Sequence, residues 1–434
     1  MSIAKLQLGT AREIITPEVG SQLYGYAPDV FSESVEDDLT VTAFYFKQGK
    51  TQALLLSVTV CLIQTELAEN IISQIEQKYK IPKENCMLCA THTHSGPNTC
   101  GQVGWGDIDR DYCTKIFVPR ILSAVEKAIS NMQSVKMGVA SGDSFVGINR
   151  RELSMENHIK LGQNPWGSFN PKMTILSFIN DLGENVAILI HYGAHGTAAG
   201  KNHEITRDWS GIMIDELEKQ SGALTAFFNG PEGDIGPRLS NGKTVGDISY
   251  VRELGKVAAK DAVRIYRNIS DFSVPKLLVS NKSLTVPLKK RIGKESAEKQ
   301  YEAFKEKTVN LQGMTKVYFE NVIESYEKGI SDQDSCEVKQ TVIAIGDIVL
   351  ASFPYELFSE IGMRINKAIK TKSVLSLSNT NGSEGYFITQ DAICRGGYEV
   401  NMFLYGHLQQ FTDDADFCLM RETVKHIQNL IEEE

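Results

Sequence analysis

The chain of 434 residues is 42% hydrophobic and 23% charged, which matches ordinary globular proteins and excludes a disordered tail or a coiled coil. Its formal net charge of −9 and its pI near 5.6 provide no broad basic surface, so nucleic acid is not an expected partner. Eight cysteines are too sparse for a disulfide scaffold and fit a reducing cytoplasm at least as well as an export route.

The start of the sequence and its apolar runs bear on where the protein works. The first residues, MSIAKLQLGTAREIITPEVG, lack a basic segment followed by an apolar one, so no secretory signal is visible, although prior removal of a signal would leave the same start. The longest apolar run, TQALLLSVTVCLI, is shorter than the ~20 residues of a membrane-spanning helix. We therefore expect a cytoplasmic protein without stable membrane insertion.

The first third of the chain alternates strand and helix patterns. TVTAFYF and TQALLLSVTVCLI flank KQGK as a predicted β-hairpin, and TELAENIISQIEQKYK has the spacing of an amphipathic helix. CMLCATHTH is again strand-like, and an amphipathic stretch, DRDYCTKIFVPRILSAVEKAISNM, precedes the strand-like VKMGVASG. This order indicates a mixed α/β fold.

Two histidines follow the strand-like run CMLCA, within CATHTHSGPNT. Because alternate residues of a strand point to one face, we expect His92 and His94 to share a face at the end of that strand. Both could then reach one metal ion, or one could bind the metal while the other transfers protons; a polar strand end without a metal is the alternative. Cys86 and Cys89, three residues apart, are expected to face opposite sides of the strand and so not to share a metal.

The rest of the chain continues in the same way. MTILSFINDLGENVAILIHYGAH predicts a hairpin, followed by a helix at GIMIDELEKQ, a strand at ALTAFFN and a long helix through VRELGKVAAKDAVRIYRNI. The charge-rich segment near 291–330 predicts a helical insertion, and TVIAIGDIVLASFPYELF predicts a hairpin around Gly346 before a helix that starts at Ser359. We expect a mixed α/β (α+β) fold in which residues 1–434 form one large catalytic domain, with mixed β-sheets flanked by helices.

A second histidine and a carboxylate repeat the placement of His92. His195 follows the apolar run AILIHYGA, and Glu356 follows the apolar run of ASFPYELF. Polar residues at strand ends in α/β proteins converge on a common crevice. Zinc takes about four nitrogen, sulfur or oxygen ligands and leaves a position open for water in catalytic sites. His92, His195 and Glu356 therefore indicate a metallohydrolase with its active site at the strand ends.

Longer motifs occur in a specific order: THTHSGP, GINRRE, HGTAAGKNHEITRDWSG, NGPEGDIGPR, FPYELFSEIGMRI and GYFITQDAICRGGYE. In this order the chain resembles the neutral/alkaline ceramidase family, from LGTAREIITP to about Tyr405. The resemblance implies hydrolysis of the amide bond of ceramide by a single zinc ion that is held by two histidines, a glutamate and a tyrosine. Matched motif by motif, these ligands are His92, His195, Glu356 and Tyr386.

The resemblance also implies roles around the metal. His94 matches a histidine that protonates the leaving amine, and Arg150 and Tyr398 match groups that face the oxyanion formed when zinc-activated water attacks the carbonyl. Arg151, next to Arg150, is expected to be solvent-exposed or to contact the substrate. Asp208, in TRDWSG, is expected either to orient a metal histidine from behind or to cap the helix that begins near Ser210.

The chain departs from the family in ways that bear on its substrate. Known members add a C-terminal immunoglobulin-like domain and are usually exported, whereas this sequence ends in the helix-like RETVKHIQNLIEEE. We expect a zinc-dependent hydrolase in sphingolipid metabolism that acts on a small-molecule or lipid N-acyl amide. The alternatives are the same chemistry on a soluble N-acyl amide or ester, and a non-catalytic, metal-stabilised binding protein. From the missing parts we predict that a short-chain or water-soluble amide has a higher kcat/KM than long-chain ceramide.

Overall fold

A computed structural model describes residues 4–432 of the chain. Its largest sheet has eight strands in the order β13-β11-β10-β6-β1-β3-β4-β5. These strands are β1 (Gln7–Ile14), β3 (Thr40–Gln48), β4 (Thr51–Val58), β5 (Cys86–Ala90), β6 (Met132–Asp143), β10 (Lys172–Asn180), β11 (Asn185–Tyr192) and β13 (Leu224–Asn229). The predicted hairpins β3–β4 and β10–β11 are confirmed as antiparallel pairs, whereas β4–β5 and β11–β13 are parallel.

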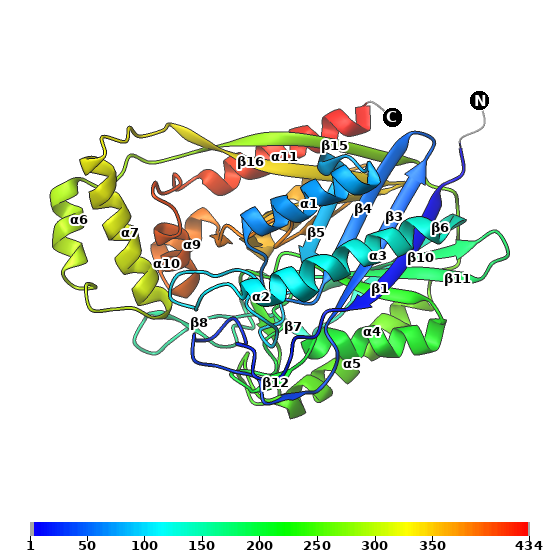
Figure 1. The fold of residues 1–434 in the computed structure, drawn as a ribbon, viewed down its shortest axis with the longest axis horizontal. Coiled ribbons are helices and arrows are strands. Elements are labelled where there is room, and N and C mark those ends of the chain that lie inside the picture. Colours follow the sequence, from blue (N-terminus) through cyan, green and yellow to red (C-terminus); the bar gives the residue numbers. More distant parts are fainter. Residues whose placement is uncertain (1–3, 433–434) are drawn as a thin grey trace.

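A second sheet has four strands in the order β15-β16-β17-β19. They are β15 (Leu277–Pro287), β16 (Ser335–Ile345), β17 (Ile348–Ser352) and β19 (Ser373–Leu377). The hairpin predicted around Gly346 is confirmed, because Ile345 of β16 pairs with Ile348 of β17. Helices α6 (Lys294–Tyr301) and α7 (Asn310–Glu327) lie in the connection between β15 and β16, at the end of the molecule away from both termini (Figure 1).

The remaining helices and short strands complete the chain. The helices are α1 (Thr65–Tyr79), α2 (Arg110–Tyr112), α3 (Val118–Ser130), α4 (Asp208–Ser221), α5 (Ile248–Tyr266), α8 (Ser359–Ala368), α9 (Gln390–Arg395), α10 (Tyr398–Tyr405) and α11 (Ala415–Glu432), with a 3₁₀ turn η1 (Lys83–Asn85) and a π-helical turn η2 (Cys113–Phe117). The short strands are β2 (Ser34–Val35), β7 (Gly147–Asn149), β8 (Arg151–Leu153), β9 (Ile159–Leu161), β12 (Glu204–Ile205), β14 (Ile235–Pro237), β18 (Glu356–Leu357) and β20 (Tyr386–Phe387).

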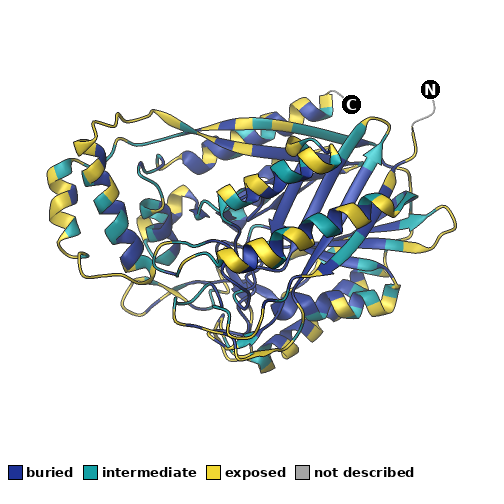
Figure 2. Cartoon of the chain, in the orientation of Figure 1, coloured by how far each residue is buried: buried dark blue, intermediate teal, exposed yellow. Residues whose placement is uncertain are grey.

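The two large sheets face each other across a shared apolar core. Alternation along β16 shows the arrangement: Ile343 and Ile345 face the eight-stranded sheet, whereas Val342 and Ala344 face α8 and α11. On its outer face, the eight-stranded sheet is covered by α1 and α3 over one half and by α4 and α5 over the other. The strands are therefore buried between helical layers whose outer faces are exposed (Figure 2), which confirms the predicted mixed α/β class.

The same alternation places the two cysteine side chains of β5 on opposite faces of the strand. Cys86 packs into the core beneath α1 and α3, and Cys89 packs into the core between the sheets. Their side chains point to opposite faces of the strand, as the spacing predicts, and they do not form a shared ligand pair.

The eight-stranded sheet curls until its two edges approach each other. Ser57 of β4 donates a hydrogen bond of 2.6 Å to the carbonyl oxygen of Phe227 in β13. At the ends of the edge strands, the side-chain amide of Asn229 donates to the carbonyl oxygen of Thr91, 3.1 Å away. The curl brings together segments that follow β5 and β11, although these strands lie far apart in the order of the sheet.

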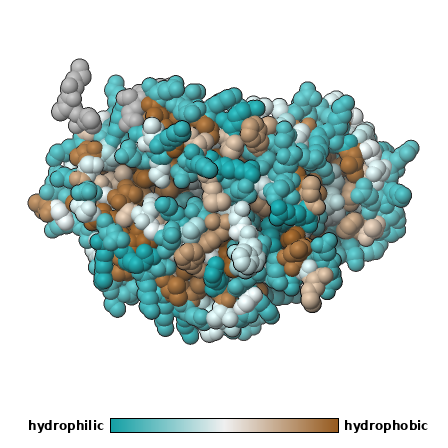
Figure 3. All heavy atoms as spheres, turned by 180° about the vertical axis from the view of Figure 1, so that it is seen from behind, coloured by the Kyte–Doolittle hydropathy of each residue, from teal (hydrophilic) through white to brown (hydrophobic). Residues whose placement is uncertain are grey.

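No helix among residues 4–432 is long and apolar enough to cross a membrane. Seen from behind, the surface is mainly hydrophilic and its hydrophobic side chains form separate patches (Figure 3). This distribution is ordinary for a protein whose apolar residues are largely used in its cores.

Candidate metal centre

His92 lies in the loop after β5 and not on the strand itself. The strand ends at Ala90, and His92 has a φ of 68°, in the left-handed region. The backbone N–H of His92 donates to the carbonyl oxygen of Val60, 2.9 Å away, and this contact helps to hold the unusual conformation. The prediction that His92 and His94 share a strand face is therefore wrong, because the backbone turns between them and Ala90.

The loop after β5 is bonded directly to the loop after β11. His94 N–H donates to Gly196 O at 3.0 Å, and Gly196 N–H donates back to His92 O at 3.2 Å. A Cβ atom at residue 196 would lie 2.8 Å from His92 O, so the two backbones approach closely only because this residue is glycine. This exchange of hydrogen bonds fixes His92 and His195 relative to each other.

Asn229, at the end of β13, fastens both loops to the sheet. Its side-chain N–H groups donate to Thr91 O and Ala194 O, and its side-chain oxygen accepts from the N–H of Ala194. Thr91 and Ala194 immediately precede His92 and His195 in the chain. Asn229 is fully buried, so its amide group is a structural clamp beneath the two histidines.

Three side-chain atoms of the predicted ligand set converge on one point. Glu356 Oε2 lies 3.3 Å from His92 Nε2 and 3.1 Å from His195 Nε2. In a tetrahedral zinc site, with bonds near 2.0–2.1 Å, neighbouring ligand atoms are roughly 3.3 Å apart. Both distances from Glu356 Oε2 match this spacing, and the three ligand atoms all lie within 4.8 Å of one another.

The far nitrogen of each histidine is held by backbone carbonyl groups. His92 Nδ1 lies 3.0 Å from Cys61 O, and His195 Nδ1 lies 2.9 Å from Glu232 O and 3.0 Å from Ile235 O. A carbonyl oxygen can only accept, so Nδ1 carries the proton in both rings and Nε2 presents a lone pair. This is the tautomer that a metal ligand needs.

The charge and burial of the cluster also fit a cation. His195 Nε2 and Glu356 Oε2 are buried and lack any hydrogen-bond partner. Burial alone would raise the pKa of Glu356, but His92 and His195 outweigh it and hold that pKa well below its ordinary value. Burial lowers the pKa of His92, but Cys61 and Glu356 outweigh it and hold that pKa well above its ordinary value, so a cation bound here would replace the proton on Nε2. The ionised carboxylate and the two Nε2 atoms then form a hard N/O set for a divalent ion.

Tyr386 lies beside Glu356, and its oxygen is bonded to Arg150. Residues 356 and 386 are paired in register between the short parallel strands β18 and β20. Arg150 Nη2 donates to Tyr386 Oη at 2.8 Å, and Arg150 Nε donates to Glu399 at 2.9 Å. Burial raises the pKa of Tyr386, and the positive charge of Arg150 acts in the opposite direction. Arg150 thus stabilises negative charge on the phenol oxygen.

Arg151 does not lie where the sequence led us to expect it. It is buried, and its guanidinium group donates to Glu399 at 2.7 Å and to Gly396 O at 2.7 Å. The expectation of a solvent-exposed charge is therefore wrong, and the alternative of a substrate contact stays a prediction. Glu399, which sequence reasoning missed, carries a fully buried carboxylate that balances Arg150 and Arg151 together.

His94 and Tyr398 are the site residues that retain access to solvent. His94 Nε2 lies 3.3 Å from His92 Nε2, and His94 Nδ1 has no hydrogen-bond partner. Burial, together with the neighbouring His92 and His195, holds the pKa of His94 well below its ordinary value, so the ring is neutral near pH 7. Tyr398 begins α10, its ring lies 6.0 Å from that of Tyr386, and no described protein group hydrogen bonds to its hydroxyl.

Asp208 acts on the loop that carries His195 and not on a metal histidine. Its two carboxylate oxygens accept the N–H groups of Ala198, Ala199 and Trp209, and Trp209 Nε1 donates to His195 O at 2.9 Å. Asp208 has a φ of 58° and lies one residue inside α4, whose N-cap is Arg207. The predicted contact with a histidine ring is replaced by the carbonyl groups described above.

A second buried carboxylate, Glu232, lies behind the cluster and was missed in the sequence. One of its oxygens accepts from Asn379 Nδ2 at 2.6 Å, and the other has no partner. Burial raises the pKa of Glu232 to about 8, although His92 acts in the opposite direction. In the sequence, Glu232 lies in NGPEGD and Asn379 lies in SNTNG. The Gly, Pro and Asn residues of these segments indicate turns, so the sequence gives no sign of a buried carboxylate and its amide partner.

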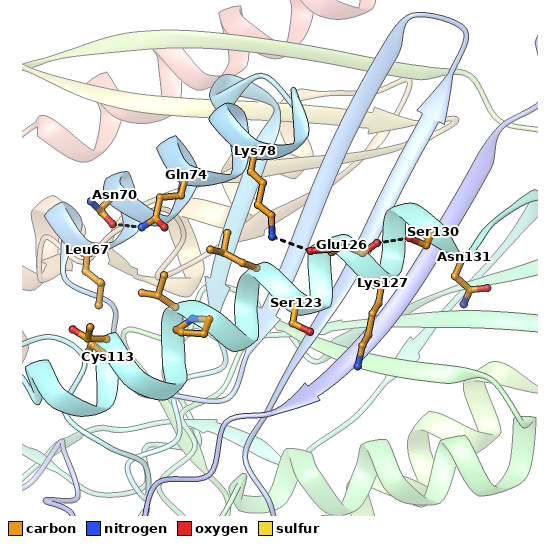
Figure 4. Close-up of a pocket in the computed structure, with 14 residues that line it drawn as sticks. Leu67, Asn70, Gln74, Lys78, Cys113, Ser123, Glu126, Lys127, Ser130 and Asn131 are labelled. Atoms are coloured by element: carbon orange, nitrogen blue, oxygen red, sulfur yellow. Dashed lines mark hydrogen bonds and ion pairs between the residues drawn. The ribbon is translucent and has the colours of Figure 1, made fainter.

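A surface groove lies away from the candidate metal ligands. A groove of about 950 Å³ runs between α1 and α3, and none of the candidate metal ligands lines it (Figure 4). Lys78 of α1 bridges the groove to Glu126 of α3 at 2.8 Å, and the facing side chains are largely polar. Lys78 and Glu126 pair across the groove, and Ser123 and Lys127 bond to Glu13 outside it, so these polar groups do not converge on one point.

Comparison with known proteins covers the part of the chain that carries His92, His94, Arg150 and His195. Residues 6–249 match the family model described as "Neutral/alkaline non-lysosomal ceramidase, N-terminal". Two curated proteins are similar at 25% identity: a neutral ceramidase of Pseudomonas aeruginosa over 205 residues, and neutral ceramidase A of Dictyostelium discoideum over 254 residues. These matches cover 43% and 53% of this chain, and 30% and 36% of the relatives, so the matched part spans about a third of their length.

The similarity in fold extends further along the chain. The crystal structure of neutral ceramidase from Pseudomonas aeruginosa superposes with a TM-score of 0.77 at 18% identity, covering 100% of this chain and 75% of that one. A structure titled "Ceramidase complexed with C2" gives a TM-score of 0.75 at 17% identity, covering 99% and 76%. The shared fold therefore includes the second sheet and the segments that carry Glu356, Tyr386 and Tyr398.

Proposed function

This chain belongs to the neutral/alkaline non-lysosomal ceramidase family, and we propose that it is a zinc-dependent amidohydrolase that cleaves the N-acyl amide bond of a ceramide-like lipid. The observation that carries the proposal is the convergence of His92 Nε2, His195 Nε2 and Glu356 Oε2 at the spacing of a tetrahedral zinc site. Two of these buried atoms, His195 Nε2 and Glu356 Oε2, have no hydrogen-bond partner that would explain the convergence in a purely structural core.

Tyr386 is the proposed fourth ligand. Its phenol oxygen is already bonded to Arg150, whose charge favours the ionised form that a metal ligand takes. Zinc bound by these four residues would supply a water of lowered pKa and a Lewis acid for the amide carbonyl. Glu399, which neutralises part of the charge on Arg150, keeps the guanidinium in place beside Tyr386.

His94 is the proposed proton carrier. It is adjacent to His92 but retains access to solvent, and its Nδ1 atom is free of any protein partner. A neutral imidazole accepts a proton as the nucleophile forms and returns it to the nitrogen of the departing amine. The lowered pKa of His94 keeps the ring in its neutral form at neutral pH and favours release of a proton once one has been accepted.

Tyr398 is the proposed donor to the developing oxyanion. Its hydroxyl is unused by the protein, and its ring is fixed against that of Tyr386. Burial raises the pKa of Tyr398 above its ordinary value, so the hydroxyl keeps its proton and can donate a hydrogen bond throughout the reaction. Arg150 acts through Tyr386 in this proposal, because both of its bonded partners are protein groups.

The proposed substrate class rests on the family, since the curated relatives are described as neutral ceramidases. This weighs against our expectation that a soluble amide is preferred. The cytoplasmic location stays a prediction. A hydrolysis screen of zinc-loaded protein against N-acyl amides of varied chain length and head group tests the proposal. Release of amine and fatty acid in equal amounts supports it; no release from any amide would favour a metal-stabilised binding protein.

A further inference from the structure

The hairpin formed by β8 and β9 exposes large apolar side chains next to the candidate site. Met155 at its tip is 99% exposed and Trp166, in the loop that follows, is 94% exposed. Leu153 and Leu161, on the two strands, are 62% and 50% exposed. Single exposed apolar residues are common on soluble proteins, but an almost fully exposed Trp and Met on one short segment indicate a surface used for contact.

The protein holds this segment in a defined conformation. At the tip, Ser154 N–H donates to His158 O at 2.9 Å, and the Ser154 hydroxyl lies 3.0 Å from His158 Nδ1. In the loop, the side-chain oxygen of Asn164 accepts a hydrogen bond from the backbone N–H of Trp166 at 3.1 Å. The side-chain N–H of Asn164 donates to Arg151 O at 3.0 Å. The exposed side chains are therefore presented by a braced turn and loop.

The base of the hairpin is continuous with the candidate site. β8 begins one residue after Arg150, and Gly162 N–H donates to Arg150 O at 2.9 Å. Ile159 of β9 packs against Gly397, where a Cβ atom would lie 3.0 Å from its side chain, and Gly397 directly precedes Tyr398. In Figure 1, β8 lies below α10, the helix that Tyr398 begins.

We propose that the β8–β9 hairpin docks on a lipid–water interface through Met155, Trp166, Leu153 and Leu161, and so presents the site to a membrane- or micelle-borne amide. The inference rests on the proposed function for the identity of the substrate. Trp is the side chain most characteristic of membrane interfaces, where its ring sits among the headgroups.

The charges of the hairpin specify the kind of lipid surface. Lys160 is paired with Glu152 at 3.2 Å, and Glu156 at the tip adds a negative charge. The whole chain carries a net charge of −9. Residues 151–166 of the described chain contain no basic cluster that would attract anionic lipid, so docking is driven by apolar contact with a neutral or zwitterionic surface and changes little with salt.

Tryptophan emission tests the docking without reference to hydrolysis. The chain has 3 tryptophans, and Trp105 and Trp209 are 4% and 0% exposed, so a change in solvent exposure reports Trp166. Adding phosphatidylcholine vesicles to the intact protein should shift its emission to shorter wavelength and shield it from iodide quenching. Emission that stays unchanged overturns the proposal, as does the same shift at higher protein concentration without lipid, which would point to a second copy of the chain.

A matched pair of variants locates the contact. Met155→Ser combined with Trp166→Ser should lower vesicle binding in flotation by tenfold or more, whereas Leu182→Ser, an 82% exposed leucine in the β10–β11 turn, should not. The double variant should retain its rate on a water-soluble short-chain amide and lose tenfold or more in kcat/KM on a micellar one. Equal flotation of both variants overturns the proposal. Absence of hydrolysis alone would contradict the proposed function and leave the flotation result standing on its own.

Discussion

Tyr398 and His94 are only partly buried, and each has a polar atom that no described protein group uses: the Tyr398 hydroxyl and the buried His94 Nδ1. The remaining groups are bonded to one another: Arg150 to Tyr386 and Glu399, and the far nitrogens of His92 and His195 to backbone carbonyls. At the scale of single residues, the site therefore separates into groups that would hold a metal and groups left free to meet a substrate. That division makes distinct predictions for the two kinds of substitution.

Replacing Tyr398 with phenylalanine should leave the metal bound and lower turnover on an N-acyl amide by roughly 10²-fold, the usual scale for the loss of one oxyanion donor. The aromatic ring, which packs against Tyr386, is retained in this variant. Zinc content by elemental analysis and kcat on the same preparation measure both effects. A variant with near-normal turnover would show that Tyr398 is a packing residue only.

His191 makes a prediction about pH and stability that is independent of the metal. It is buried in β11, its Nε2 donates to Ser376 O at 2.9 Å, and burial lowers its pKa to about 4. In the unfolded chain the pKa of His191 is near 6.5, so between about pH 6.5 and pH 4 His191 is protonated in the unfolded chain but not in the folded protein. The free energy of unfolding therefore falls as the pH drops from about 6.5 to about 4. Each unit of displacement corresponds to about 1.4 kcal/mol.

His191→Gln, which keeps a donor for Ser376 O, should remove this contribution. The free energy of unfolding in urea would be measured about every pH unit between pH 4.5 and pH 7.5. It should fall less steeply towards acid pH in the variant than in the parent chain. His203→Gln is the control, because His203 is exposed. An unchanged slope in the His191 variant would contradict the assignment.

At the scale of elements, the site depends on the contact between the loop after β5 and the loop after β11. Gly196→Ala would place a Cβ atom 2.8 Å from His92 O and 3.0 Å from Thr93 Cα, so one loop must move. Because the two histidines are positioned by this contact, the variant should bind zinc on the order of 10- to 100-fold more weakly. Gly293→Ala, where nothing lies within 4 Å, is the control. Equal affinities measured by competition with a chelator would show that the loops are not coupled to the metal.

Helices α6 and α7 depend on a small apolar cluster of their own. Its buried members are Ala297, Tyr318, Phe319 and Val322. Phe319→Ala should cost about 3–5 kcal/mol within this cluster, and hydrogen exchange should accelerate in α6 and α7 while the sheets stay protected. Phe178→Ala, in the core between the sheets, should instead lower protection throughout. Uniform loss of protection in the Phe319 variant would show that these helices unfold together with the rest of the chain.

At the scale of the whole molecule, local features could be predicted and long-range ones could not. The hairpins β3–β4, β10–β11 and β16–β17 follow from apolar runs separated by turn residues, and the helical spacing of α1 buries Ala68, Ile71 and Ile75 as the pattern predicts. The curl that brings the edges of the eight-stranded sheet together depends on contacts between distant segments, such as Ser57 with Phe227. No periodicity in the sequence encodes such a contact.

The same distinction holds within the site. His92, His195 and Glu356 could be proposed from their common placement after apolar strands, and the structure brings their ligand atoms together. Glu399 and Glu232 could not, because a buried carboxylate is recognised by the partners that surround it and not by its neighbours in the chain. The exposure of Arg151 was mispredicted for this reason: its partner Glu399 lies more than two hundred residues further along the sequence.

The central claim is that one metal ion, held by His92, His195, Glu356 and Tyr386, makes this chain an amidohydrolase. The most direct test titrates zinc into chelator-treated protein while recording amide hydrolysis. We predict that the rate rises in proportion to added zinc and reaches its plateau at one ion per chain, with no such rise in the His92→Ala, His195→Ala double variant. Full activity in the chelator-treated protein, or a zinc-dependent rate that survives loss of both histidines, would contradict the account.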